Sequence, residues 1–360
     1  MDDWLIDDDR LSLARKSVLP GEGFFVPDSF EEEVEAQEAA EALDGAETVI
    51  VADPDADGLG CVALVREAFG DAALLPASPH ELDEAIEHVA TYAEAGARVF
   101  VCDLAADERD DLAALSTVVD RAAAVRWFDH HQWDEAAAER VRAAGVDLVV
   151  GDSDEECSMD VTYRSIDYAF PERFGDLAAA TRDHDLWIRE DPRSDDVADF
   201  AYWADAEEYV TTVREHGAAL PPAVQDYLAE RRVEKQALID KAVERADVRE
   251  VGPWTVGVTY GRCSQNEVAE RLREQGTDAA VVVKPAGSAS IRGSESFERC
   301  HEVARQVNGG GHPRAAGCKP DVYDDMLDYA HHWTTHGAVA KRAIVDAFLR
   351  LDVEDDPDAA

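Results

Sequence analysis

Three apolar runs that each stop on ionisable residues constrain this chain more than any other feature of its sequence. The runs occupy residues 48–52, 98–102 and 125–128, and the polar residues that follow them are, in order, Asp53, Asp55, Asp57, Asp103, Asp129, His130 and His131. Runs of this length that are rich in β-branched residues predict buried strands. Carboxylates crowded at strand ends repel one another, and hard divalent cations prefer oxygen ligands, so the pattern indicates a metal site.

The alternation of strands and helices predicts the fold class. The expected strands are 47–52, 98–103, 125–129 and 146–150, and the expected helices open at Gly58 and cover 85–95, 107–123 and 158–169. This order is typical of a parallel sheet with helices on both faces. Ligands of such sheets gather beyond the carboxyl ends of the strands, so the three polar ends should meet. Each motif alone is also compatible with a solvated acidic turn or a solvated histidine pair. The presence of all three motifs in this order favours a metal site.

A second, smaller domain is predicted in the C-terminal half. Strands at 254–260, 279–284 and 289–292 and a helix at 265–274 follow a long charged helix that starts near Pro222 and either bridges the domains or covers the first one. We therefore expect an α/β protein with a parallel-sheet N-terminal domain and a smaller C-terminal α/β domain across a cleft. The expected parts are an acidic N-terminal extension (1–44), a metal-binding catalytic domain (45–195), a helical linker (196–250), a substrate-binding domain (251–345) and an acidic tail (346–360).

The charge balance indicates the conditions under which the protein works. The chain of 360 residues has 79 acidic and 34 basic residues, a net charge of −45, and only 6 of the bases are lysine. An excess of this kind, spread over the whole chain, predicts a halophilic, archaeal protein, because high salt screens the mutual repulsion. Attraction to nucleic-acid phosphates would then be weak and would depend on a few local arginines.

The cysteines and the lengths of the apolar runs indicate the cellular compartment of the protein. The six cysteines form no CxxC pair and lie mostly in apolar surroundings, which predicts buried free thiols rather than zinc ligands or disulfides. No run approaches 18 apolar residues, and the amino terminus lacks a basic leader. These features predict a cytoplasmic protein with no membrane partner.

On the basis of these strand-end residues, the sequence resembles the DHH phosphoesterase superfamily. The resemblance is carried by the 55–58 motif DADG, by the single Asp103 and by the Asp129-His130-His131 triplet, in the chain order of that family. The family's fourth motif is an aspartate in a later segment, for which Asp183 fits best and Asp185 is the alternative. The chain departs from the family pattern at Val51, where many members have a ligand histidine, and Asp53 is the candidate substitute.

The C-terminal half resembles the DHH-associated domain. The matching residues are the 290–292 segment SIR and the 308–317 segment NGGGHPRAAG, which has the glycine run, histidine and small-residue pair of that domain. Together the two signatures cover roughly residues 45–320. A glycine run alone is a weak signal because it also suits a flexible turn, and its pairing with the upstream triplet makes it specific.

The resemblance implies phosphoester hydrolysis with two divalent ions, usually Mn²⁺, with Mg²⁺ as the alternative. It implies that Asp103 bridges the ions, that Asp55 binds one ion, and that Asp57 and His130 bind the other with Asp183 (or Asp185) closing the set. His131 would contact the phosphate or assist the leaving group, and Asp129 would orient an imidazole. The implied phosphate contacts in the second domain are Arg292, Gly310, Gly311, His312 and, more weakly, Arg314.

Three functions are compatible with this reading. The first is an exonuclease of the RecJ or nanoRNase type acting on single-stranded nucleic acid or short oligonucleotides, with base-stacking candidates Trp187, Tyr202, Trp203 and Trp254. The second is a phosphatase for polyphosphate, pyrophosphate or 3′-phosphoadenosine 5′-phosphate. The third is a degenerate, non-catalytic subunit, which Val51 keeps open. The sequence leaves the oligomeric state open and allows an oligomer.

Overall fold

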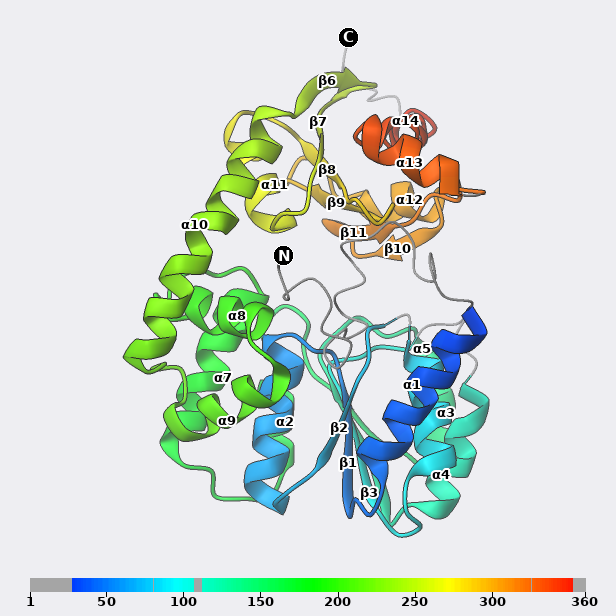
Figure 1. Ribbon diagram of the computed structural model, residues 1–360, viewed down its shortest axis with the longest axis vertical. Coiled ribbons are helices and arrows are strands. Elements are labelled where there is room, and N and C mark those ends of the chain that lie inside the picture. The colour runs from blue at the N-terminus through cyan, green and yellow to red at the C-terminus, as the bar shows by residue number, and fades with distance from the viewer. Residues whose placement is uncertain (1–27, 80, 107–111, 325, 352–360) are drawn as a thin grey trace, which may run out of the picture. The chain divides into compact units, whose positions relative to one another are not determined.

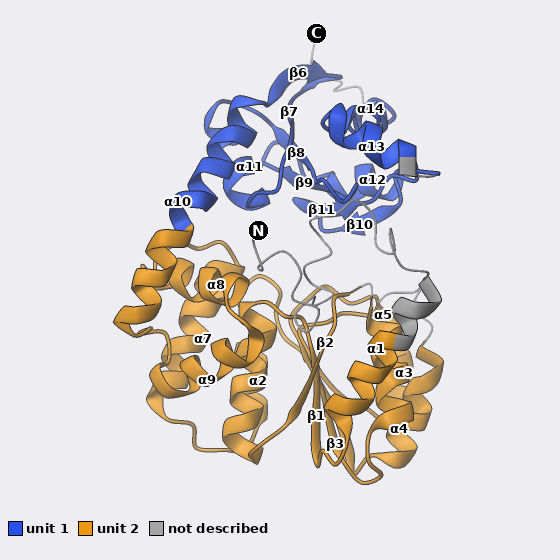
Figure 2. Ribbon diagram, viewed as in Figure 1, with its two compact units in different colours: residues 1–28, 232–360 blue, residues 29–231 orange. Residues whose placement is uncertain are grey.

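The computed structural model describes residues 28–79, 81–106, 112–324 and 326–351, and it separates into two compact units (Figure 2). One unit spans Ser29–Arg231, and the other takes up the chain from Arg232 onward. Helix α10 (Pro222–Glu244) contains the junction between them. Most of the predicted N-terminal extension (1–27) and most of the predicted tail (352–360) lie outside the described residues.

The first unit is built on a five-stranded, fully parallel sheet in the order β2-β1-β3-β4-β5. The strands are β1 (Thr48–Ala52), β2 (Ala73–Pro76), β3 (Arg98–Cys102), β4 (Ala124–Asp129) and β5 (Asp147–Val150). Four of them match the predicted strands closely. The fifth, β2, was not predicted; it has four residues, ends in proline and lies at the sheet edge, where a missing N–H is tolerated. The sheet confirms the predicted fold class.

Helices cover both faces of this sheet (Figure 1). Alternate strand residues divide between two apolar clusters, since successive side chains of a strand point to opposite faces. One cluster joins the sheet to α2, α6, α7, α8 and α9, and the other joins it to α1, α3, α4 and α5. The helices are α1 (Asp28–Leu43), α2 (Ala56–Phe69), α3 (Leu82–Tyr92), α4 (Leu115–Arg121), α5 (Glu135–Ala143), α6 (Ser158–Ser165), α7 (Glu172–Asp185), α8 (Ser194–Trp203) and α9 (Ala206–His216).

The strand order places one pair of strand ends at a topological switch point. The chain turns from β1 to β2 on one side and then crosses back to β3 on the other, so the loops after β1 and β3 diverge. In open α/β sheets with this 2-1-3-4-5 order, ligands bind where the order reverses. The aspartates that follow β1 and the aspartate that follows β3 flank this point, and the end of β4 lies beside it.

The second unit is built on a six-stranded mixed sheet in the order β10-β11-β9-β8-β7-β6. Only β7 and β8 are parallel. Two apolar clusters cover its faces, one with α12 and α14 and the other with α10 and α11. Its elements are β6 (Asp247–Val251), β7 (Trp254–Tyr260), α11 (Gln265–Glu274), β8 (Ala279–Val283), β9 (Ala289–Gly293), α12 (Cys300–Arg305), β10 (Gly309–Gly311), β11 (Ala315–Cys318), α13 (Met326–Thr334) and α14 (Ala338–Phe348).

Several local expectations change in the structure. The expected helix at 107–123 is a short 3₁₀ turn (Leu112–Ala114) followed by α4, with 107–111 outside the described residues. The helix expected at 158–169 ends at Ser165, shortly before Pro171 begins α7. All six cysteines are free thiols, five of them buried and Cys263 partly buried. No helix in the described ranges has the length and apolarity needed to span a membrane.

Candidate functional site

The loop after β1 turns directly into α2 and gives its aspartates different environments. Asp55 is the N-cap of α2, and its Oδ1 accepts hydrogen bonds from the backbone N–H groups of Asp57 (2.9 Å) and Gly58 (3.1 Å). Gly58 is required because a Cβ there would lie 2.1 Å from the carbonyl oxygen of Asp53. Asp57, in the first turn of α2, is 2% exposed. The loop therefore buries Asp57 and leaves Asp55 at the surface.

Asp57 is held by the start of α6, a hundred residues further along the chain. Its two carboxylate oxygens accept the backbone N–H groups of Ser158 and Met159, each at 2.7 Å. Burial raises the pKa of Asp57, the negative charge of Asp55 raises it further, and these two hydrogen bonds only partly offset them, giving a value of about 6. The side chain is thus fixed in place while its negative charge is only partly stabilised.

Asp103 directly follows β3 and has a backbone conformation that few non-glycine residues adopt. Its φ is +59°, its side chain is buried, and its Oδ1 accepts a hydrogen bond from the Ser158 hydroxyl at 2.9 Å. Burial raises the pKa of Asp103 well above its ordinary value, and the neighbouring charges of Asp57, Asp55 and Asp185 raise it further. Backbone strain and a crowded buried acid at one position are typical of a ligand-binding site.

Asp129, which ends β4, is fully buried and orients the second histidine of the triplet. Its Oδ1 lies 2.8 Å from Nδ1 of His131, and its Oδ2 accepts the indole N–H of Trp133 at 2.6 Å. Burial alone would raise the pKa of Asp129, but the hydrogen bond and charge of His131 and the bond from Trp133 outweigh it and lower the pKa. Burial lowers the pKa of His131, but the hydrogen bond and negative charge of Asp129 outweigh burial and raise this pKa to about 9.

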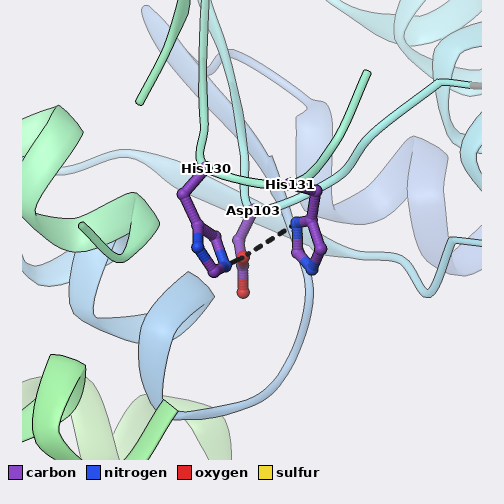
Figure 3. Close-up of side chains that lie close together, drawn as sticks. All are labelled: Asp103, His130 and His131. Carbon is purple, nitrogen blue, oxygen red and sulfur yellow. Dashed lines mark ion pairs between the residues drawn. The ribbon is translucent and has the colours of Figure 1, made fainter. Parts of the chain in front are cut away.

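His130 faces the carboxylates. Its Nε2 lies 3.9 Å from Asp57 Oδ2, 3.9 Å from Asp103 Oδ1 and 3.3 Å from Asp185 Oδ2, and Figure 3 shows it and His131 on either side of Asp103. Burial, followed by the positive charge of His131, lowers the pKa of His130 to about 4. His130 is therefore neutral at pH 7, the form in which imidazole binds metals.

The two candidate aspartates at the end of α7 differ in what they contact. Asp185, the last residue of the helix, brings its carboxylate to His130. Asp183 is buried, and its Oδ1 accepts the backbone N–H groups of Glu190 (2.8 Å) and Asp191 (3.1 Å). Asp185 therefore lies in the cluster, whereas Asp183 holds the following loop. This geometry favours Asp185, the alternative, over Asp183, the first choice made from the sequence.

Two groups of side chains within the described residues could hold a cation. One group is Asp103, His130 and His131, and the other is Asp57, His130 and Asp185; within each, one ligand atom per residue lies within 4.8 Å of the others. Carboxylates with a neutral imidazole suit Mn²⁺ or a similar divalent ion. A cation would also relieve the repulsion that raises the pKa values of Asp57, Asp103 and Asp185. The donor set therefore fits a divalent centre.

Asp55, Asp53 and Val51 belong to neither group. The charge of Asp55 nevertheless raises the pKa of Asp57 and Asp103, so it lies within electrostatic reach. Burial, and then the charge of Asp55, raise the pKa of Asp53 to about 7. Val51 is fully buried in the apolar cluster between the sheet and α3, where it supplies no ligand.

The residues expected to bind phosphate lie on or between neighbouring strands of the second unit. Arg292 on β9 lies opposite Ala315 on β11, and its Nε donates to Asn266 Oδ1 at 2.6 Å. The backbone N–H of His312 donates to the carbonyl of Ala315 at 2.7 Å, and His312 is partly exposed. Gly310 and Gly311 are part of β10, which pairs with β11, and Arg314 is exposed between them.

Ser158 is the site residue that the sequence did not reveal. It is fully buried; its backbone N–H binds Asp57, and its hydroxyl lies 2.9 Å from Asp103 and 3.3 Å from Asp129. One serine therefore contacts the polar ends of three strands or their following loops. The available signal was weak: a serine at the start of a predicted helix that follows a strand.

No family model matches the chain, and no curated protein matches its sequence. Several solved structures are similar in fold. The exonuclease RecJ bound to manganese has a TM-score of 0.54 and 17% identity, covering 93% of this chain and 96% of that one. A DHH domain from a protein described as a member of a ribosomal protein family has a TM-score of 0.53 and 14% identity, covering 95% and 97%. A pGpG-specific phosphodiesterase from Vibrio has a TM-score of 0.50 and 12% identity, covering 83% and 99%.

These likenesses confirm the fold that the sequence resemblance implied. The chain has the fold of DHH-domain proteins over most of its length, in both of its units. At this level of identity, the activity must be argued from the residues of the site itself.

Proposed function

We propose that the protein is a DHH-family phosphoesterase that uses two divalent ions, Mn²⁺ in the first instance, to hydrolyse phosphodiester bonds in single-stranded nucleic acid or short oligonucleotides. The observation that carries the proposal is the arrangement around His130. Its Nε2 lies within 4 Å of three carboxylates that come from separate parts of the chain, those of the buried Asp57 and Asp103 and that of Asp185, which is an exposed residue. A folded protein has no structural need to bury acids that repel one another, so a cation is the simplest reason for the cluster.

The proposed ligands are Asp57, Asp103, His130 and Asp185. When bound, a pair of divalent ions would neutralise charge on the phosphoryl oxygens and supply a nucleophilic water at neutral pH. Asp103 lies centrally and is the candidate bridge. Asp183, the first choice from the sequence, is less favoured than its alternative Asp185, because Oδ1 of Asp183 holds two backbone N–H groups and only Asp185 brings its carboxylate to His130.

His131 would act on the substrate. Its Nδ1 is bound to Asp129, which fixes the orientation of the ring beside Asp103. The hydrogen bond and charge of Asp129, which is not one of the proposed ligands, raise the pKa of His131 and favour a ring that donates a hydrogen bond. This assignment also accounts for the Asp129 carboxylate, which would be the orienting group. Asp55 would cap α2 and add negative charge near the ions.

The second unit would bind the rest of the substrate through Arg292 and the glycine strand. A guanidinium matches the oxygens of a phosphate, and glycine at 310 and 311 lets the backbone approach closely. His312 and Arg314 are further candidate contacts. We correspondingly propose 45–195 as the catalytic domain, 196–250 as a linker and 251–345 as the substrate-binding domain.

The test is hydrolysis by the purified full-length protein in Mn²⁺ and high salt. A five-nucleotide RNA or DNA should release mononucleotides, and Asp57→Asn and His130→Asn should abolish release while Asp240→Asn, a surface substitution, should not. Orthophosphate from polyphosphate without mononucleotide release would favour the small-molecule phosphatase. No turnover and no bound metal would favour the non-catalytic subunit and overturn the proposal.

A further inference from the structure

The loop that follows α7 begins beside the cluster of carboxylates around His130. Asp185, the last residue of α7, brings its carboxylate to 3.3 Å from His130 Nε2, and Trp187 is two residues further along the chain. Consecutive Cα atoms are about 3.8 Å apart, so the Cα of Trp187 lies within about 7.6 Å of the Cα of Asp185. Trp187 is partly buried, and the next side chain, Ile188, is 46% exposed. A large aromatic ring is therefore anchored close to the proposed metal ligands.

Two residues of this loop have a backbone conformation that non-glycine residues rarely adopt. The φ angle is +56° at Trp187 and +61° at Arg189, and the described ranges contain three other non-glycine residues with positive φ. One of these three is Asp103, which belongs to the cluster itself. Such a conformation costs stability at a bulky residue, persists only where the surrounding structure imposes it, and is concentrated at binding sites.

Asp183 imposes the conformation of the loop. Its carbonyl oxygen accepts the backbone N–H groups of Ile188 (2.9 Å) and Arg189 (3.3 Å), and its Oδ1 accepts those of Glu190 and Asp191. One buried residue thus binds four successive N–H groups of the loop. The loop conformation is fixed before a substrate binds, and this lowers the entropy cost of binding.

The loop stacks the guanidinium of Arg189 on the indole of Trp187. The guanidinium carbon lies 4.6 Å from the centre of the indole ring. Asp195, in the first turn of α8, accepts a hydrogen bond at Oδ2 from Nη2 of Arg189 (3.1 Å), and its Oδ1 lies 3.2 Å from Nδ1 of His184. The His184 ring packs against the same indole, with 5.6 Å between the ring centres. One carboxylate therefore holds both neighbours of the indole in place.

The other aromatic side chains named as base-stacking candidates lie elsewhere or pack in a core. Trp254 packs edge-on against Phe297 in the apolar cluster of the second unit. Tyr202 and Trp203 are at the end of α8 opposite the end that contains Asp195. Of the four candidates, only the indole of the α7–α8 loop closely follows a proposed metal ligand in the chain.

We propose that the stack of Trp187 and Arg189 is a nucleobase platform, on which a nucleotide bound at the cluster places its base. The inference rests on the proposed function and narrows its substrate class to nucleotides, because polyphosphate and pyrophosphate have no ring to stack. Indole rings and guanidinium planes both stack on bases, and Arg189 is exposed while Trp187 is partly exposed. Every base has a π-face, so the platform accepts all bases without reading a sequence.

The experiment compares a deoxyadenosine dinucleotide with the same dinucleotide lacking both bases, as substrates of the full-length protein in Mn²⁺ and high salt. Trp187→Ala should raise KM for the dinucleotide at least about fivefold and leave KM for the abasic analogue unchanged. Trp187→Phe, which keeps a smaller ring, should restore most of the loss. Tyr168→Ala, at a 43% exposed tyrosine beyond the far end of α6, is the matched control and should change neither KM.

Two outcomes overturn the inference. An equal effect of Trp187→Ala on both substrates would show that the indole only supports the structure around Asp185, and no effect on either substrate would show that it has no part in binding. If Trp187→Ala does not fold, Arg189→Met removes the guanidinium, keeps most of the aliphatic chain and should lower the preference for the base-bearing substrate. An unchanged preference in folded Arg189→Met protein also overturns the stack as the platform.

Failure of the proposed function is distinguishable from failure of this inference. If the wild-type protein hydrolyses neither substrate, the proposed function fails, and calorimetric binding of AMP and of ribose 5-phosphate in Mn²⁺ then tests the platform directly. Tighter binding of AMP by the wild type, with the difference lost in Trp187→Ala and kept in Tyr168→Ala, supports the platform. Equal or absent binding of the two compounds by the wild type, or a difference that Trp187→Ala keeps, overturns it.

Discussion

Replacing Ser158 by alanine should separate metal binding from general stability. In the metal-free protein, burial and the neighbouring carboxylates raise the pKa of Asp103 and disfavour its charged form, so the lost hydroxyl contact is closer to a bond between neutral groups. Such a bond contributes about 1 kcal/mol. With metal bound, Asp103 is ionised, and a bond to a charged group contributes about 1.5–3 kcal/mol. The substitution should therefore destabilise the metal-bound state more than the metal-free state.

The difference between the two states appears as weaker metal binding. A difference of about 1.4 kcal/mol corresponds to a tenfold loss of Mn²⁺ affinity, within the roughly 10–100-fold typical of groups that orient metal ligands. At free Mn²⁺ one hundred times the wild-type Kd, the ion should stabilise the wild type by about 2.7 kcal/mol and Ser158→Ala by about 1.4 kcal/mol. The backbone N–H of residue 158 is retained, so Asp57 keeps its bond.

The assay is urea unfolding at fixed salt with and without Mn²⁺, together with calorimetric Mn²⁺ titration. Ser194→Ala is the matched control, because Ser194 is also buried and its hydroxyl donates to the Asp191 carbonyl, away from the cluster. The control should lose stability equally in both states and keep its Mn²⁺ affinity. If Ser158→Ala also loses stability equally in both states, with less than a twofold change in affinity, the reasoning is refuted.

Three further outcomes are expected. Asp185→Asn should lower Mn²⁺ affinity by more than about 100-fold, which exceeds the effect of losing a group that only orients a ligand. Asp183→Asn should instead lower the unfolding free energy by about 1–3 kcal/mol and leave Mn²⁺ affinity unchanged. Calorimetric titration and urea unfolding distinguish these outcomes, and the reverse result would restore Asp183 as the ligand. Gly309→Ala places a Cβ 2.1 Å from the Gly317 carbonyl and should destabilise the protein by about 3 kcal/mol, whereas Gly317→Ala, with its nearest neighbour at 4.0 Å, should be tolerated in thermal unfolding. Because the pKa of His131 is raised to about 9, this residue stabilises the metal-free protein fully below its unfolded pKa near 6.5, and the stabilisation is lost as pH rises through 9. The unfolding free energy of His131→Gln, measured by urea unfolding, should not show this decrease across the same pH range.

Local sequence was sufficient to predict most of the parallel sheet of the first unit. The runs before Asp53, Asp103 and Asp129 are apolar and β-branched because strands of a parallel sheet are buried on both faces. Helical segments between them made the sheet parallel, and parallel strands bring their carboxyl ends to one edge. Chain order therefore predicted that Asp57, Asp103 and His130 lie at one edge of the sheet, where His130 Nε2 lies 3.9 Å from each of the two carboxylates.

The glycine run shows where local reasoning was insufficient. Residues 309–311 have low strand propensity and were equally compatible with a turn, and they form β10 because β11 pairs with them. The clash that a side chain at Gly309 would make is with the β11 backbone, which is a property of the pairing. Strand formation here depends on a neighbour rather than on the residues themselves.

What the sequence determined by itself is four of the five strands of the parallel sheet and the aspartates and histidines at their ends, since these follow from the hydrophobic pattern and parallel topology. Only the tertiary structure shows that Asp185 lies beside His130 whereas Asp183 holds the following loop, and only the tertiary structure reveals Ser158. Residues two apart near a helix end face different directions, and which direction meets His130 depends on how α7 packs on the sheet. Ser158 contacts a group 101 residues away, and a contact of that range leaves no local pattern in a sequence.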